Sequence, residues 1–311
     1  MKLRPRSEDI PWMVAGTVIL CLIVLVVWHF LAGTSPAQRL AFKASRVELV
    51  GRMQLALATA SDAEKSAVLA ITDQDSQRFA DQARAALAEI ERERNELGKL
   101  LAIGGTQQER DLLVQFSEAL GALQRIDDEV LRLAVKNTNL KAYGLLFGPA
   151  ADTLAEMDAA LSRVVAKHAD VPDARRAALL AFNARIQVLR IQTLLAPHIA
   201  EENDAEMDRL EAAMAKEEVQ VRKELDGLAA LPSLEDNADL TTARSSFVRY
   251  GEFKAKILAL SRENTNVQSL TLSLNQERKA MALCLDPLSA MKQAILEEPI
   301  PGVTYSQLPT R

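Results

Sequence analysis

VLRLAVKNTNLKAYG (130–144) and ILALSRENTNVQSLT (257–271) are two versions of one stretch, and this stretch decides the fold. In each copy an apolar helical pattern runs into Asn-Thr-Asn, and a second helical pattern follows. The copies lie about 127 residues apart, which is too long for a solenoid repeat and close to the length of a whole domain. The sequence therefore predicts a duplicated helical domain.

The repeat extends upstream of the tripeptide. ITDQDSQRFADQARAALAEIERERNELGKL (71–100) echoes IAEENDAEMDRLEAAMAKEEVQVRKELDGL (199–228) at nearly the same offset. Asparagine tolerates the left-handed conformation that closes a helix, and it also caps a following helix. We therefore interpret the tripeptides as turns of αα-hairpins rather than as ligand contacts. The residues of this helix-turn motif are Asn137, Thr138 and Asn139 in one copy and Asn264, Thr265 and Asn266 in the other.

The composition favours an all-α protein. Aromatic residues make up only 4% of the 311 residues, whereas alanine, leucine and charged helix formers abound. The net charge of −5 gives no reason to expect a nucleic-acid partner. Neither the two cysteines, Cys21 and Cys284, nor the histidines have the spacing of a metal or haem motif, so no cofactor and no metal site is predicted.

Residues 11–33 form an apolar run long enough to cross a bilayer. Trp12 and Trp28 lie near its ends, where indoles favour the headgroup region. A cleaved signal peptide is the competing interpretation. The positive residues before the run are Lys2, Arg4 and Arg6. They predict a single-pass protein of the bacterial inner membrane, with residues 1–10 in the cytoplasm and the bulk of the chain in the periplasm.

Beyond the anchor, periodicity predicts eight helices, grouped as two up-down-up-down four-helix bundles. The expected bundles span 36–169 and 173–296, and 297–311 is expected to be a loose tail. Gly148-Pro149 predicts either a kink in the fourth helix or a delayed start of that helix. If that helix returns to the membrane, the chain must turn near 169–173, so we expect the two bundles to lie side by side.

Two segments resemble a known family. ASDAEKSAVLAITDQDSQRFADQARAALAEIERERNELGKLL (60–101) and QERDLLVQFSEALGALQRIDDEVLRLAVKNTNLKAYGLLFGPAADTLAEMDAAL (108–161) look like the four-helix-bundle sensor domain of methyl-accepting chemotaxis receptors. The resemblance covers about 40–168 well and 174–296 more weakly. It implies an extracytoplasmic ligand sensor that is usually dimeric and anchored by a membrane helix on each side. This sequence shows no second span and no cytoplasmic signalling coiled coil.

The expected function is accordingly a membrane-anchored periplasmic sensor or adaptor module that acts through a partner protein. The alternative is a structural or scaffolding protein of the cell envelope that has no small-molecule ligand. An enzyme is not expected, because the sequence offers no nucleophile with a base, no paired carboxylates in a defined pocket and no phosphate-binding glycine loop. The expected partners are the inner membrane, a signalling or envelope protein, a small ligand and a second copy of the chain.

Candidate ligand-binding residues lie on the first helix of each repeat, where the resembling sensors often bind acidic ligands at a bundle interface. They are Arg46, Arg52, Arg185 and Arg190. The competing interpretation is a solvated helix face or an ion pair with a facing helix. A second group consists of four acidic residues, Glu201, Glu202, Asp204 and Glu206. It can be interpreted as a cation site, but the simpler interpretation is that its negative charge complements the positive end of a helix.

Overall fold

The computed structural model describes residues 35–300, and within that range every regular element is a helix. The all-α prediction is confirmed there. None of the helices in this range has both the length and the apolar character needed to cross a membrane. The predicted anchor (11–33) and the end of the predicted tail (301–311) lie outside the described residues.

Four helices form the first bundle, which contains both ends of the described chain. Three of them are consecutive and the fourth comes from the C-terminal end: α2 (Pro36–Leu69), α3 (Asp73–Gly104), α4 (Gln107–Ala134) and α11 (Arg278–Glu297). One apolar core joins them, and its largest members include Met53, Leu57, Ile90, Phe116 and Leu120, together with Leu288 and Met291 from α11. The C-terminal helix is therefore an integral part of this core.

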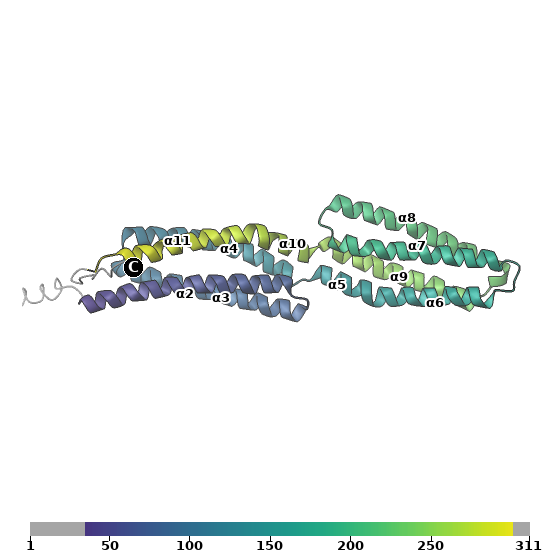
Figure 1. Ribbon diagram of the computed structural model, residues 1–311, viewed down its shortest axis with the longest axis horizontal. Helices are drawn as coiled ribbons and strands as arrows, with labels where there is room; N and C mark the ends of the chain where they lie inside the picture. The colour runs from purple at the N-terminus through teal and green to yellow at the C-terminus, as the bar shows by residue number, and fades with distance from the viewer. Residues whose placement is uncertain (1–34, 301–311) are drawn as a thin grey trace, which may run out of the picture.

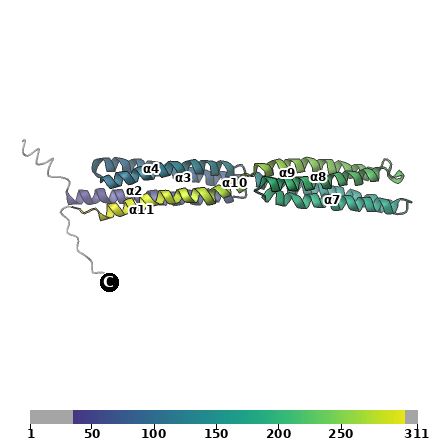
Figure 2. The ribbon, with the colours of Figure 1, turned by 90° about the horizontal axis from the view of Figure 1, so that it is seen from above.

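In the order of the chain, the second bundle is inserted between the third and fourth helices of the first bundle. It consists of α6 (Ala151–Lys167), α7 (Ala174–Ala200), α8 (Asp204–Ala229) and α9 (Ala238–Glu263), with the short turn η2 (Pro232–Leu234) before α9. A separate core fills it, with members such as Met157, Leu161, Ile191, Phe247 and Tyr250. The two bundles lie end to end and form one elongated rod (Figures 1 and 2).

Two short helical segments connect the bundles. The chain leaves the first bundle through α5 (Thr138–Leu145) and the π-helical turn η1 (Leu146–Ala150), and it returns through α10 (Thr265–Leu272) and the π-helical turn η3 (Ser273–Glu277). The predicted kink at Gly148-Pro149 is confirmed, since Gly148 has non-helical torsion angles inside η1 (φ −102°, ψ −109°). Both segments start at an Asn-Thr-Asn tripeptide.

The expected division into bundles 36–169 and 173–296, placed side by side, is wrong. Each repeat keeps its first three helices together and contributes its fourth helix to the other bundle (Figure 1). Residues 169–173 are the hairpin between α6 and α7 at the far end of the rod, not a domain boundary. The physical reason is that the chain continues in nearly the same direction after each tripeptide, so the next helix buries its apolar face in the other bundle.

The caps of α3 and α4 depend on residues within one helical turn. Thr106 and Glu109 form a capping box at the start of α4, with reciprocal backbone-to-side-chain hydrogen bonds of 3.2 Å. Thr72 accepts a hydrogen bond from the backbone N–H of Asp75 and begins α3. Turn chemistry at these sites is local, which is why it could be read from sequence.

Candidate functional site at the bundle junction

The junction is the level of the rod at which α5 and α10 begin, and it is formed by the two Asn-Thr-Asn tripeptides. Asn137 and Asn264 both adopt the left-handed conformation, with φ of 52° and 49°. Only a few residue types enter this region at low cost, and asparagine is one of them. Each tripeptide thus ends one helix and starts the next without reversing the chain.

The two tripeptides cap each other's helices. The backbone N–H of Thr138 donates to Thr265 Oγ1 (3.2 Å), and the N–H of Thr265 donates to Thr138 Oγ1 (3.1 Å). One residue later, the N–H of Asn139 donates to Asn266 Oδ1 and the N–H of Asn266 donates to Asn139 Oδ1, both at 3.1 Å. The first N–H groups of a helix have no partner within the helix. Here those of α5 and α10 are satisfied reciprocally.

The asparagine side chains extend this exchange. Asn139 Nδ2 donates to Asn264 Oδ1 (2.7 Å), and Asn266 Nδ2 donates to Asn137 Oδ1 (3.0 Å). Asn137 Nδ2 also donates to Asp73 Oδ1, and this hydrogen bond is the main cause of a lowered pKa for the Asp73 carboxyl. The αα-hairpin interpretation of the tripeptides is therefore wrong: they join two bundles, and within residues 35–300 neither Asn137 nor Asn264 caps its own helix.

The C-terminal end of α7 is tied to the same network. Its free carbonyls at Ile199 and Glu201 accept hydrogen bonds from Asn139 Nδ2 (2.6 Å) and Asn264 Nδ2 (2.8 Å). Ser261 Oγ, from the last turn of α9, donates to the carbonyl of His198 (2.9 Å). Both tripeptides therefore hold the end of a helix that belongs to the second bundle.

A buried histidine lies beside this helix end. His198 is fully buried, with Nδ1 2.8 Å from Ser261 Oγ and Nε2 2.8 Å from Glu211 Oε1. Hydrogen bonds from Arg262 and from His198 lower the pKa of Glu211. This line of serine, histidine and glutamate resembles a catalytic arrangement in its order, but Ser261 is also fully buried, so its contacts fit a link between α7, α8 and α9.

On the first-bundle side of the junction, three carboxyl groups lie inside the protein. This carboxyl cluster consists of Glu64 on α2, Asp127 on α4 and Glu277 on η3, which are 0%, 2% and 1% exposed. Ser273 Oγ donates to Glu64 Oε2 (3.2 Å), and Ser61 Oγ donates to Glu277 Oε1 (3.1 Å). One oxygen of each carboxyl has no hydrogen-bond partner within the described part of the chain.

The cluster holds protons at neutral pH. Burial, and then the charge of Glu277, raise the pKa of Glu64 to about 7. Burial, and then Glu277 and Glu64, raise the pKa of Asp127 to about 8, and burial also raises the pKa of Glu277. Among residues 35–300, no group of acidic, histidine or cysteine side chains is placed to hold a metal ion.

The second bundle has no counterpart of the carboxyl cluster. The positions that correspond to Glu64, Asp127 and Glu277 in the repeat are Gln192, Lys254 and Ala150. Gln192 is satisfied by Leu146 and Tyr250, and Lys254 pairs with Glu218. Unpaired buried carboxyls are costly, so their presence in only one of two similar bundles marks them as a candidate functional feature.

The four candidate arginines do not form one site. Arg46 is buried in the first bundle, where its guanidinium bonds both oxygens of Glu109 (2.8 and 2.6 Å) and one of Glu298 (2.5 Å). Arg52 is half exposed and lies 3.2 Å from Glu93. In the second bundle, Arg185 pairs with Asp158, and Arg190 lies 3.7 Å from Glu217. Each contact is an ion pair with a facing helix, and ligand binding by these residues stays a prediction.

The predicted acidic group lies around the start of α8 and makes local contacts there. Glu201 Oε1 accepts hydrogen bonds from the N–H groups of Glu202 and Asn203, both at 2.9 Å. Asn203 caps α8 through the N–H groups of its first turn, and Glu206 pairs with Arg209. These contacts match the simpler of the two interpretations, in which the acidic group complements the positive end of the helix.

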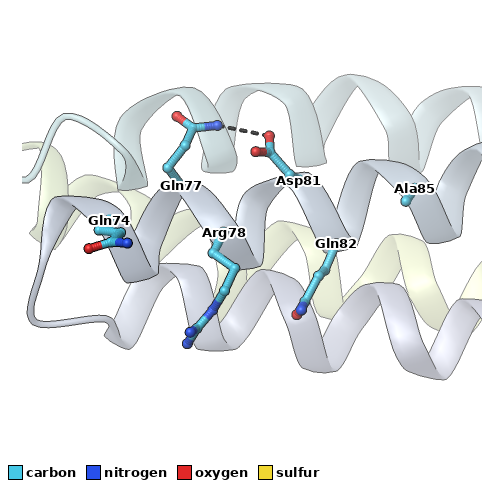
Figure 3. Close-up of a pocket in the computed structure, with 6 residues that line it drawn as sticks. All are labelled: Gln74, Gln77, Arg78, Asp81, Gln82 and Ala85. Atoms are coloured by element: carbon cyan, nitrogen blue, oxygen red, sulfur yellow. Dashed lines mark hydrogen bonds between the residues drawn. The ribbon is translucent and has the colours of Figure 1, made fainter.

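Two hollows on the described surface are candidates for a ligand site. A shallow one of about 600 Å³ runs along α3 alone, and Figure 3 shows its side chains spread along one helix rather than converging; the pair Gln77 and Asp81 bond each other there (2.8 Å). A more enclosed cavity of about 600 Å³ lies at the opposite end of the first bundle from the junction, between the start of α2, the end of α3 and residues 298–300. Arg46 lines it but is already paired with Glu109 and Glu298.

Replacing Thr138 with valine is expected to lower the free energy of unfolding by about 1–3 kcal/mol, because the buried N–H of Thr265 loses its acceptor. Amide exchange should rise at the starts of both α5 and α10, although only one of them carries the substitution. Thr59→Val is the matched control, since Thr59 is exposed and bonds only the carbonyl of Leu55 in its own helix. Exchange that rises only in α5 would contradict reciprocal capping.

Comparison of the chain with protein-family models and with curated proteins finds no match. The geometry of the junction indicates what it can do. The junction joins the bundles by two chain crossings, and hydrogen bonds between the crossings satisfy the helix ends. It also lies near protonatable carboxyls: Asp127 precedes Asn137 by ten residues, which is about 15 Å along α4.

Proposed function

We propose that this chain is a membrane-anchored, extracytoplasmic sensor or adaptor module that passes a change in its second bundle back to its anchored end and acts there through a partner protein. The supporting observation is the route of the chain. Both ends of the described segment belong to the first bundle, and within residues 35–300 the chain passes between the bundles only at α5 and α10 (Figure 1). A helix shift in the second bundle would therefore reach the anchored end through the junction.

Contacts at the anchored end support this route. Lys43 Nζ donates to the carbonyls of Leu296 (2.7 Å) and Glu298 (2.6 Å), so the start of α2 and the end of α11 are fastened together. α2 begins three residues after the predicted anchor at 11–33. A displacement of α11 along α2 would thus be felt next to the membrane. The resemblance of 60–101 and 108–161 to chemoreceptor sensor domains favours the same function.

Such a module needs two packing states whose balance a ligand can change. The junction is suited to this, because polar cross-caps are directional and the carboxyl cluster near it can change charge. A ligand shifts the balance only by its difference in affinity for the two states.

Binding of a small ligand by the full chain in phosphatidylcholine nanodiscs tests the proposal. A panel of amino acids, organic acids and nitrate should contain a compound that raises the melting temperature; at about one hundred times its Kd the stabilisation is about 2.7 kcal/mol. The same compound should alter amide exchange at the starts of α5 and α10. A panel without a hit, or a hit that leaves the exchange of these amides unchanged, would contradict the sensor function.

The alternative is a structural or scaffolding protein of the cell envelope. The end-to-end arrangement favours it: α2 has 34 residues and α7 has 27, so the two bundles together extend about 90 Å. A rod of this length, with its halves fastened at a polar junction, would serve as a spacer. Under this alternative no compound of the panel binds. Thr138→Val then changes only the stability of the protein.

A further inference from the structure

The exposed side of α7 carries an apolar stripe that the fold does not use. Leu179, Phe182 and Leu189 are 59%, 57% and 56% exposed, and Ile186 between them is half-buried. We call these four residues the α7 seam. Their spacing of three, four and three residues is that of the contact positions of a two-helix coiled coil. A different set of residues on α7 forms the core of the second bundle: Ala177, Ala181, Ala184, Val188, Ile191 and Leu195.

The corresponding helix of the first repeat shows that the seam is not required by the architecture. The buried positions of α2 match those of α7 at a constant offset of 128 residues, for example Leu49 with Ala177 and Ala60 with Val188. At the same offset, the seam positions in α2 are held by small or polar residues: Gly51, Gln54, Ala58 and Ser61. Only the second bundle has large apolar side chains there.

The charged side chains of α7 itself are all positive. α7 contains four arginines and no aspartate or glutamate. Arg185 and Arg190 pair with acids on α6 and α8, whereas Arg175 and Arg176 are exposed and make no ion pair within residues 35–300. These two arginines lie in the first turn of α7, where the helix macrodipole is also positive. This end of the seam therefore attracts negative charge.

We propose that the α7 seam docks an acidic amphipathic helix of a partner protein, with apolar residues at coiled-coil spacing against Leu179, Phe182, Ile186 and Leu189 and carboxylates near Arg175 and Arg176. Helix-in-groove recognition uses apolar anchors at this spacing, and opposite charge along the edges sets the partner and its orientation. The proposal holds whether the module senses a ligand or serves as a scaffold.

Two other occupants fit the seam less well. A second copy that packs α7 against α7 would bring the arginines of both helices together, with no acid from either α7 to offset them. An anionic membrane surface suits a basic helix, but such helices use a broad apolar face, and the start of α7 lies at the end of the rod away from α2 (Figure 1). A narrow seam far from the predicted anchor matches a partner helix.

Site-specific photocrosslinking of the full chain in its native host tests the proposal. A photoreactive phenylalanine analogue placed at Phe182 is compared with the same analogue at Val248, an equally exposed apolar residue (57%) on α9 of the same bundle. The expected result is a crosslink from position 182, absent from 248, that maps by mass spectrometry to an acidic amphipathic helix of another protein. The double charge reversal Arg175→Glu and Arg176→Glu should reduce its yield about tenfold or more.

Three outcomes would overturn the proposal. A crosslink between two copies of this chain assigns the seam to self-association. A crosslink to lipid alone, with binding of the purified chain to phosphatidylglycerol vesicles that Phe182→Asp abolishes, assigns it to the membrane. Equal crosslinking from positions 182 and 248 shows that the seam is ordinary surface. The melting temperature of each variant is measured in parallel, so that a folding defect is not read as lost docking.

Discussion

Raising the pH from about 5.5 to about 9 is expected to lower the free energy of unfolding by several kcal/mol, because the folded protein must then ionise the buried carboxyl cluster. The pKa values of Glu64 and Asp127 are raised to about 7 and about 8 in the folded state, first by burial. At pH values between the ordinary carboxyl pKa near 4 and these raised pKa values, the folded protein therefore binds more protons than the unfolded chain. Stability is full below the unfolded pKa values, falls as the pH rises from those values, and has lost this contribution once the pH has passed through the folded ones.

The surroundings of the cluster offer little compensation. The positive charge of Lys65 acts on Glu64 and Glu277, but its ammonium donates its hydrogen bond to Ser61 Oγ (2.6 Å). Asp128 is negative, and the Cys284 thiol has a pKa raised to about 12 by burial and by Asp127, so it stays neutral. At low pH the opposite trend begins, since carboxyls with lowered pKa such as Glu211 lose their stabilising hydrogen bonds when protonated.

Neutral replacements test this directly. Glu64→Gln and Asp127→Asn should each reduce the loss of stability between pH 5.5 and pH 9, by about 2 and about 3 kcal/mol respectively, because pH 5.5 lies about 1.5 and about 2.5 units below the two folded pKa values. Asp128→Asn is the matched control, because Asp128 is the exposed neighbour on the same helix and its replacement should change stability by less than about 0.5 kcal/mol. Urea unfolding at both pH values gives the comparison. Parallel losses of stability in the parent and in Asp127→Asn would refute this account of the cluster.

Replacing Arg46 with methionine is expected to cost about 3–5 kcal/mol, because it leaves the carboxylate of Glu109 buried without its counter-charge. Arg46 and Glu109 are 2% and 0% exposed, and the guanidinium bonds both carboxylate oxygens. Adding Glu109→Gln should recover most of the loss, since glutamine keeps an acceptor for the N–H of Thr106 and removes the buried charge.

Arg52→Met is the control for this prediction. Arg52 lies less than two turns further along α2, but its side chain is 51% exposed, and its pair with Glu93 should contribute less than about 1 kcal/mol. Thermal and urea unfolding of the two single variants and the double variant decide the matter. If Arg46→Met loses no more stability than Arg52→Met, the buried ion pair is not a structural element, and the case for Arg46 as a ligand contact becomes stronger.

The sequence could predict the helices, because caps, prolines and apolar periodicity act within one or two turns. Thr106 and Glu109 had to form a capping box wherever α4 was placed, and Gly148-Pro149 had to interrupt a helix. It could also have indicated the carboxyl cluster. Glu64 lies four residues after Ala60 and three before Ala67, and Asp127 has the same spacing from Leu123 and Val130. These four apolar residues are buried, so the helical period places both carboxyl groups on the inner face.

Other parts of the site carried no such signal. His198 has ordinary neighbours in sequence, and its partners Glu211 and Ser261 lie on two other helices. The partners of the four predicted arginines were likewise unknowable, since an ion pair with a facing helix depends on which helices face each other. The docking surface of α7 becomes visible only once the structure shows which side of that helix is covered.

The amino-acid sequence by itself determined that this protein is a duplicated chain of helices and where some of those helices are capped or interrupted. Only the tertiary structure decided which bundle receives the fourth helix of each repeat. Either arrangement buries the same apolar faces, so hydrophobic patterning cannot choose between them. The choice is made at the junction, where Thr138 and Asn139 satisfy the N–H groups of Thr265 and Asn266 and are satisfied by them in turn, contacts that form only when two segments 127 residues apart meet.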